Sequence, residues 1–151
     1  MAIALQNDAK KVLNRLIETD QEGKEGYELA AKHVENLEYK SIFNQYAQQR
    51  AEFAATLRSH VPAADMSGNM LTDAAAALHR GWINIKSVVN SGDSEAILNE
   101  CVRGDRAAVE AYEDALKEQT LPADVQSVLQ EQHRAINEAY HRMKTLARIE
   151  D

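Results

Sequence analysis

The chain reads as a series of amphipathic helices, and the clearest of them spans Val125 to Leu146. Apolar residues recur in this segment at spacings of three, four and seven, which places them along one stripe of a long helix. The same periodicity predicts a first helix from Asn7 or Asp8 to Val34 and a second from about Glu38 to His60. Because only a short turn near Asn36 separates them, these two helices should form an antiparallel hairpin.

The rest of the chain predicts a loop followed by three more helices. The segment Val61–Met70 contains a cluster of helix-breaking residues and forms the longest predicted loop. A third helix over about Leu71–Val89 follows, and Asp93 or Ser94 caps a fourth that runs to about Gln119. Leu121-Pro122 then starts the last helix.

Two hairpins joined by a helical connection match an all-α, ferritin-like four-helix bundle with five helices in all. At about 1.5 Å per residue, the roughly 19 residues of the third helix cover about 29 Å, close to the length of a bundle helix. The third helix can therefore cross from one end of the bundle to the other. A five-helix up-and-down array, in which the third helix is a fifth bundle member, is the alternative.

Composition and charge narrow the classes of function. A length of 151 residues suits one domain, residues 1–151, with a full hydrophobic core. The net charge of -7 argues against a nucleic-acid partner, since phosphate binding needs clustered Lys and Arg. The start lacks the apolar core of a secretory signal, and no apolar run is long enough to span a bilayer, so we expect a cytoplasmic protein without a membrane partner. The single cysteine, Cys101, is expected to be a buried structural thiol.

Glu138 and His141 match the Glu-x-x-His motif of di-metal centres in ferritin-like bundles, where both side chains project inward. Counted at about 100° per residue from Met143, at the centre of the stripe, both fall on the opposite side of the helix. We therefore expect both to face solvent and regard them as weak surface candidates for a metal. The histidines are dispersed, and none has an evident orienting partner that would make it a general base. They are His33, His60, His79, His133 and His141.

Arg50 occupies the centre of the apolar stripe of the second helix, where an apolar residue would be expected. Asp20 and Lys24 lie on the inner side of the first helix. If the hairpin turns near residues 36 and 37, facing residue numbers sum to about 73, which brings Asp20 within one helical turn of Arg50. We predict a buried charge cluster in which Asp20 pairs with Arg50 and Lys24 extends outward. The alternative is that Arg50 runs its stem along the core and reaches water.

Two glycines and a tryptophan predict close packing. Gly23 and Gly26 interrupt the first helix at a cost of about 1 kcal/mol each relative to Ala, which favours close approach by another helix. Trp82 shares the inner face of the third helix with Leu78 and Ile85, so we expect it to be buried.

Three segments carry a resemblance to a known family. They are Leu16–Tyr27, Ala77–Ile83 with its Leu-His-Arg-Gly-Trp stretch, and Arg103–Asp105 followed by Ala-Tyr-Glu at 111–113. From about Val12 to Leu146, the chain resembles an uncharacterised bacterial family of ferritin-like four-helix-bundle proteins, a domain of unknown function that is distantly similar to rubrerythrins. The resemblance implies the bundle fold and suggests a role in the stress response, but it implies no established activity.

The same resemblance supplies a template for a metal site. Rubrerythrin-type helices place Glu-x-x-His where this chain has Arg50 and Phe53, and beside Gly104-Asp105 it has Ala108 where a second carboxylate would be useful. Neither arginine nor phenylalanine can bind a divalent cation, so the resemblance implies a degenerate di-metal site. We therefore predict a non-catalytic binding or structural protein without a metal cofactor, which binds an unknown protein partner and can form a homodimer. The alternative is a di-iron or di-manganese redox enzyme of the rubrerythrin or ferritin type.

Overall fold

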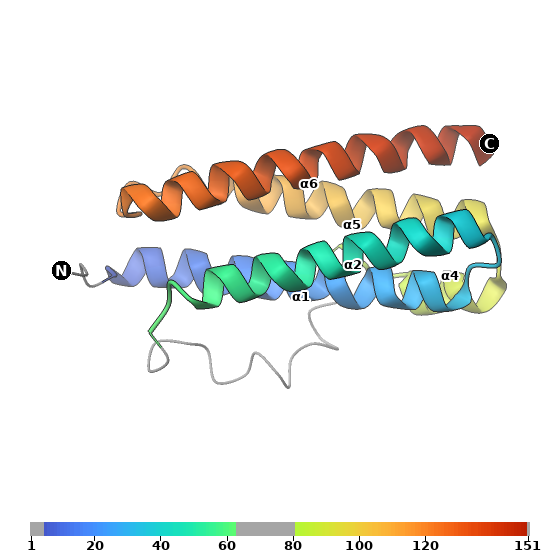
Figure 1. The fold of residues 1–151 in the computed structure, drawn as a ribbon, viewed down its shortest axis with the longest axis horizontal. Coiled ribbons are helices and arrows are strands. Elements are labelled where there is room, and N and C mark those ends of the chain that lie inside the picture. The colour runs from blue at the N-terminus through green and yellow to red at the C-terminus, as the bar shows by residue number, and fades with distance from the viewer. Residues whose placement is uncertain (1–4, 63–80, 151) are drawn as a thin grey trace.

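The computed structural model describes residues 5–62 and 81–150, and the helices in these ranges form a bundle (Figure 1). No strand occurs within the two ranges, so the described chain is all-α, as predicted. The helices are α1 (Asn7–His33), α2 (Leu37–Arg58), α4 (Ile85–Ser91), α5 (Ser94–Ala115) and α6 (Ala123–Glu150).

The long helices form two antiparallel hairpins, α1 with α2 and α5 with α6 (Figure 1). Because α1 also packs directly against α5, the two hairpins close into one four-helix bundle. α2 ends near the start of α1, whereas α5 begins at the opposite end of the bundle beside α4 (Figure 1). The hairpins are therefore connected from one end of the bundle to the other, which favours the predicted four-helix arrangement over the up-and-down array.

Helix ends follow local signals in the sequence. Asn36 caps α2 and Asp93 caps α5, and each side chain accepts a hydrogen bond at 3.0 Å from a backbone N–H of the first turn. Both caps satisfy an N–H that has no partner within its helix. α5 ends at Ala115, earlier than the predicted Gln119. After Ala115, backbone hydrogen bonds between residues three apart replace the helical pattern, and the Glu118 carboxylate accepts a hydrogen bond from the backbone N–H of Thr120.

The predicted third helix over Leu71–Val89 is confirmed in its described part only for Ile85–Val89, which lie in α4. Residues 71–80 lie outside the described ranges, and Gly81–Asn84 form a turn instead of a helix. The backbone N–H of Asn84, the residue before α4, donates to the Glu100 carboxylate of α5 at 2.6 Å. This bond and the burial of Trp82 hold the turn against the bundle.

The core consists of two apolar clusters with polar side chains between them. One cluster contains Phe43, Trp82 and Met143, and it lies toward the turn between α1 and α2. The other contains Leu13, Leu57 and Leu129 and lies toward the opposite end of the bundle. Buried polar side chains from all four long helices lie between the clusters, and we call them the polar layer. The layer comprises Asp20, Arg50, Asp105 and Gln132 together with the hydroxyl groups of Tyr27 and Tyr112, whose rings belong to the first and the second cluster respectively.

Trp82 is buried in the first cluster with 2% of its surface exposed, as predicted. Its indole lies where two glycines leave room between α1 and α5, because a Cβ at Gly26 or Gly104 would overlap the ring. Tyr27 packs edge-on against the same indole, with 5.0 Å between ring centroids. Gly26 was predicted to allow close approach by another helix, but the space beside it is occupied by the side chain of Trp82 from the segment that connects the hairpins.

We expect Gly104→Ala to destabilise the protein by about 1 to 3 kcal/mol, although alanine is the better helix former by about 1 kcal/mol. The added methyl group would have to displace the Trp82 indole within a filled core. Urea denaturation followed by circular dichroism measures the change in the free energy of unfolding. A variant at least as stable as the wild type would contradict the described packing of Trp82.

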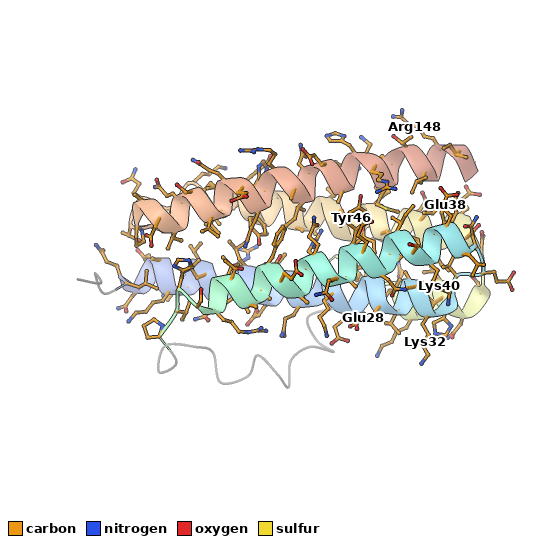
Figure 2. All side chains as sticks on the ribbon, in the orientation of Figure 1. Glu28, Lys32, Glu38, Lys40, Tyr46 and Arg148 are labelled. Carbon is orange, nitrogen blue, oxygen red and sulfur yellow. The ribbon has the colours of Figure 1, made fainter. Side chains whose placement is uncertain are left out.

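The outer faces of the helices carry charged side chains, as Glu28 and Arg148 show (Figure 2). Large apolar side chains are exposed at Leu37, Ile83 and Ile149, and isolated apolar residues of this kind are normal on a protein surface. Among the described residues, no helix has the length and apolar character needed to cross a membrane.

Candidate functional site

The centre of the polar layer is an ion pair between α2 and α5. Arg50 Nη2 donates to Asp105 Oδ1 at 2.6 Å, and the two side chains are 1% and 0% exposed. Tyr27 on α1 donates its hydroxyl proton to the other oxygen, Asp105 Oδ2, at 2.5 Å. Three helices therefore meet on one carboxylate, through short bonds of the charge-assisted kind.

A second buried carboxylate, Asp20 on α1, contacts α5 and through it α6. The Tyr112 hydroxyl oxygen lies 2.7 Å from Asp20 Oδ2 and 2.8 Å from Gln132 Oε1. Gln132 Nε2 in turn donates to the backbone carbonyl of Phe53 on α2 at 3.5 Å. This chain of contacts runs from the centre of the core to the side of the bundle between α2 and α6.

The protonation states of the two carboxyl groups in the layer depend on their burial and on their attraction to the Arg50 guanidinium. Burial raises the pKa of Asp20 to about 7, while attraction to Arg50 limits the rise. Burial likewise raises the pKa of Asp105 to about 6, again opposed by Arg50. Burial alone would lower the pKa of Arg50, but Asp105 and Asp20 outweigh it and raise that pKa, so the guanidinium stays charged. The layer is electroneutral when Arg50 and Asp105 are charged and Asp20 is protonated.

We expect Asp20→Asn to flatten the pH dependence of stability between about pH 5 and pH 7. The folded-state pKa of Asp20 is raised above the unfolded value, so the contribution of Asp20 to stability is lost as pH rises through this window. The loss should be about 2 kcal/mol, and asparagine, which has the size of a protonated aspartate but cannot ionise, avoids it. Urea denaturation at about pH 5 and about pH 7 measures the free energy of unfolding of both proteins. From the lower to the higher pH, the stability of the variant relative to the wild type should rise by about 2 kcal/mol.

Asp114→Asn is the matched control, because Asp114 lies on α5 with 62% of its side chain exposed. This change should leave the pH dependence of stability as it is in the wild type. If Asp20→Asn and the wild type showed the same pH dependence, Asp20 would have to be ionised throughout the window.

Arg50 pairs with Asp105 and not with Asp20, so this part of the predicted charge cluster is wrong. Gly23 lies level with Arg50 across the hairpin, and a Cβ at that glycine would overlap Arg50 Nη1. The numbers of these two facing residues sum to 73, as the predicted hairpin register requires. Because Gly23 has no side chain, the arginine can extend past α1 and reach α5. Asp20 acts on Arg50 through its charge, as the pKa shifts of both groups show.

The other predicted site residues lie outside the polar layer. Lys24 has 39% of its side chain exposed, and its Nζ pairs with Glu28 at 3.2 Å. Glu138 and His141 are exposed on α6, the orientation that their register on the helix predicts. His79 lies outside the described residues.

Cys101 is fully buried on α5, as predicted for a structural thiol. Burial, together with the neighbouring Asp105 and Glu100 carboxylates, raises the pKa of the thiol well above its ordinary value. Because the thiolate is the reactive form of cysteine, this residue is not set up for nucleophilic or redox chemistry.

Sequence reasoning missed Tyr27, Asp105, Tyr112 and Gln132 as members of one cluster. A signal was present for α5, since Asp105 lies among the small inward-facing residues of its stripe and Tyr112 follows one heptad later. Tyr27 and Tyr112 are both fully buried, and burial raises the pKa of each hydroxyl well above its ordinary value. Gln132 gave no signal, because a glutamine on a helix is most often exposed.

The polar layer does not have the donor set of a di-metal centre. Such centres in ferritin-like bundles combine carboxylates from four helices with two histidines. The layer supplies only Asp20 and Asp105, and the Arg50 guanidinium bonded to Asp105 is a permanent cation with no lone pair to donate. Across residues 5–62 and 81–150, no group of three or more His, Cys, Asp or Glu side chains could hold a metal ion.

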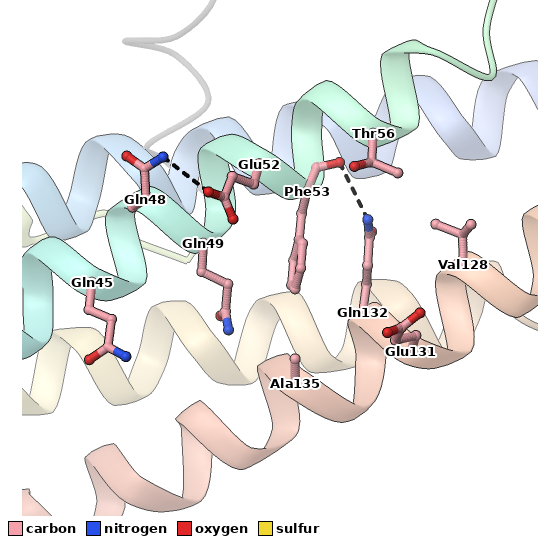
Figure 3. A pocket seen from close by; sticks show the side chains of 10 residues that line it. All are labelled: Gln45, Gln48, Gln49, Glu52, Phe53, Thr56, Val128, Glu131, Gln132 and Ala135. Carbon is pink, nitrogen blue, oxygen red and sulfur yellow. Dashed lines mark hydrogen bonds between the residues drawn. The ribbon is translucent and has the colours of Figure 1, made fainter.

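A groove of about 650 Å³ opens beside the polar layer between α2 and α6 (Figure 3). Figure 3 shows Gln49 and Phe53 pointing from α2 toward α6, and Gln132 pointing back toward the Phe53 carbonyl. Four glutamines, two glutamates and a threonine line the groove with Phe53, Val128 and Ala135, and no Lys, Arg or His is among the lining residues. Its volume lies in the range of ligand sites, and its lining is mostly uncharged and polar.

Comparison with known proteins identifies the family. Residues 8–118 match a family described as a domain of unknown function, DUF2383, which is uncharacterised as the resemblance implied. The match includes Asp20, Arg50 and Asp105, whereas α6 with Gln132 follows it. No curated protein matches the sequence. Because the match covers well over half of the chain, the protein belongs to the DUF2383 family.

Proposed function

We propose that this protein is a non-catalytic, metal-free binding protein of ferritin-like topology, in which an ion pair replaces the metal centre. The Arg50–Asp105 pair carries the proposal, because a buried guanidinium stands where the resemblance to rubrerythrins puts a metal-ligating glutamate. A divalent cation placed beside this fixed charge would be repelled strongly in a core of low dielectric constant. The remaining carboxylate, Asp20, is already held by Tyr112.

Metal analysis of untagged protein, expressed in medium supplemented with iron and manganese, tests this proposal. We expect well under about 0.1 equivalent of either metal per chain, since the layer lacks the ligands of a di-metal centre. About two equivalents per chain, together with peroxide consumption, would overturn the proposal and favour the di-iron or di-manganese redox enzyme.

The binding surface that we propose is the groove between α2 and α6. Its two glutamates and the absence of basic lining residues favour a cationic occupant. Its glutamine amides can bond to a peptide backbone, and Phe53 and Val128 offer apolar contact. We therefore propose a protein partner that inserts a segment rich in Lys or Arg.

Ala135→Arg tests the groove, because Ala135 lies in its α6 wall (Figure 3), where an arginine would fill the space and oppose a cationic segment. The matched control is Ala55→Arg, at an exposed position of α2 that does not line the groove. Against a partner captured by the wild type, the groove variant should bind at least about tenfold more weakly while the control binds normally. Equal binding by both variants would place the binding surface elsewhere.

A further inference from the structure

The Tyr112 hydroxyl contacts two acceptor oxygens with a single proton. Asp20 Oδ2 lies at 2.7 Å and Gln132 Oε1 at 2.8 Å from the hydroxyl oxygen. A hydroxyl donates only one hydrogen bond, so one of the two contacts needs a proton from the other partner. The hydrogen bonding of Tyr112 and Gln132 therefore depends on whether Asp20 is protonated.

When Asp20 is protonated, the described orientation gives the Tyr112 hydroxyl and the Gln132 amide hydrogen bonds of the right direction. Asp20 donates to the Tyr112 oxygen, and Tyr112 donates to Gln132 Oε1. Gln132 Nε2 then donates to the Phe53 carbonyl and joins α6 to α2 across the groove (Figure 3).

When Asp20 is ionised, it takes the Tyr112 proton and leaves Gln132 Oε1 facing another acceptor, which is unfavourable in a buried site. Turning the amide over would place Nε2 on Tyr112 but would bring Oε1 against the Phe53 carbonyl, again two acceptors. Gln132 must then give up its contact with Phe53, and its Oε1 turns toward the groove.

We propose that Asp20, Tyr112 and Gln132 form a proton-linked relay that sets which hydrogen-bonding group Gln132 presents to the α2–α6 groove. In the protonated state, the contact between Gln132 and Phe53 joins the two helices at the groove. In the ionised state, this contact is released and the groove gains an acceptor, which suits a cationic segment. The inference rests on the proposed function only in treating this groove as the binding surface.

The charged groups around Asp20 set the pH at which the relay operates. α2 contributes Arg50 and Arg58, which both favour the ionised form. α5 contributes Tyr112 and the Asp105 carboxylate that Arg50 binds, while α6 contributes the uncharged Gln132. Burial opposes ionisation and brings the pKa of Asp20 to about 7, so the relay changes state near neutral pH.

The relay can be measured without a ligand, by following the Gln132 side-chain amide resonances of the labelled full-length protein from mildly acidic to mildly alkaline pH. In the wild type, these resonances should move with the same midpoint as the carboxyl resonance of Asp20. In Asp20→Asn, they should stay at their acid-side positions throughout. In Tyr112→Phe, the Asp20 carboxyl should still titrate while Gln132 no longer follows it.

Gln132 resonances that titrate in Asp20→Asn as in the wild type would assign the change to another titrating group and overturn the relay. An Asp20 titration that leaves Gln132 unmoved in the wild type would overturn it equally. If Tyr112→Phe does not fold, these two outcomes still decide. Because the measurement contains no partner and no metal, its result is separate from those of Ala135→Arg and of the metal analysis.

Discussion

Asp105→Asn should destabilise the protein by about 3 to 5 kcal/mol, the usual cost of leaving a buried charge without its partner. The amide cannot neutralise Arg50, which is 1% exposed and whose raised pKa keeps it charged. The change also weakens the hydrogen bond from the Tyr27 hydroxyl. This hydroxyl would face either the uncharged amide oxygen of the asparagine, which is a weaker acceptor than a carboxylate, or its NH2 group, which cannot accept. Urea denaturation at neutral pH measures the loss in the free energy of unfolding.

Two comparisons isolate the role of charge in this result. Asp20→Asn alters an equally buried carboxylate of the same layer, yet it should cost little because asparagine resembles the protonated form that burial favours. The double change Arg50→Met with Asp105→Leu should recover most of the loss, since it removes both charges. The double-mutant cycle compares this double variant with the single changes Arg50→Met and Asp105→Leu. A coupling energy below about 0.5 kcal/mol would mean that Asp105 is not the partner that compensates the charge of Arg50.

Trp82→Ala should cost about 3 to 5 kcal/mol, because it empties the space between α1 and α5 that the indole fills. Two glycines shape this space, so no neighbouring side chain at positions 26 or 104 can expand into it. Circular dichroism during urea denaturation measures the loss, and the fluorescence of the wild-type tryptophan should be blue-shifted.

Ile83→Ala is the control for this experiment, since Ile83 is the next residue in the same turn and is 53% exposed. It should change the free energy of unfolding by less than about 0.5 kcal/mol. A loss below about 1 kcal/mol for Trp82→Ala, or a red-shifted emission of the wild type, would mean that the indole is not enclosed.

The helices and hairpins could be predicted from the sequence because their signals are local. Apolar periodicity marks the stripe of each long helix, and Asn36 and Asp93 mark helix starts by their capping chemistry. The burial of Arg50 also followed from its place on a stripe. Each of these inferences needs only residues within a few turns of one another.

The partners within the core could not be predicted in the same way, because they join residues far apart in the chain. The partner of Arg50 depends on a glycine at position 23, which redirects the guanidinium from α1 to α5. The turn at Gly81–Asn84 depends on Glu100, whose carboxylate reaches back from α5. Periodicity describes one face of one helix and carries no information on such contacts.

The polar layer between the two apolar clusters also restricts how the hairpins can align. Sliding one hairpin along the other by a single helical turn, about 5.4 Å, would move Arg50 off Asp105 and place an uncompensated charge against apolar side chains. We infer that the layer selects one register, much as a single buried polar residue does in a coiled coil. The double variant Arg50→Met with Asp105→Leu should then fold stably but give doubled or broadened core resonances, and one sharp set of resonances would show that the apolar packing alone fixes the register.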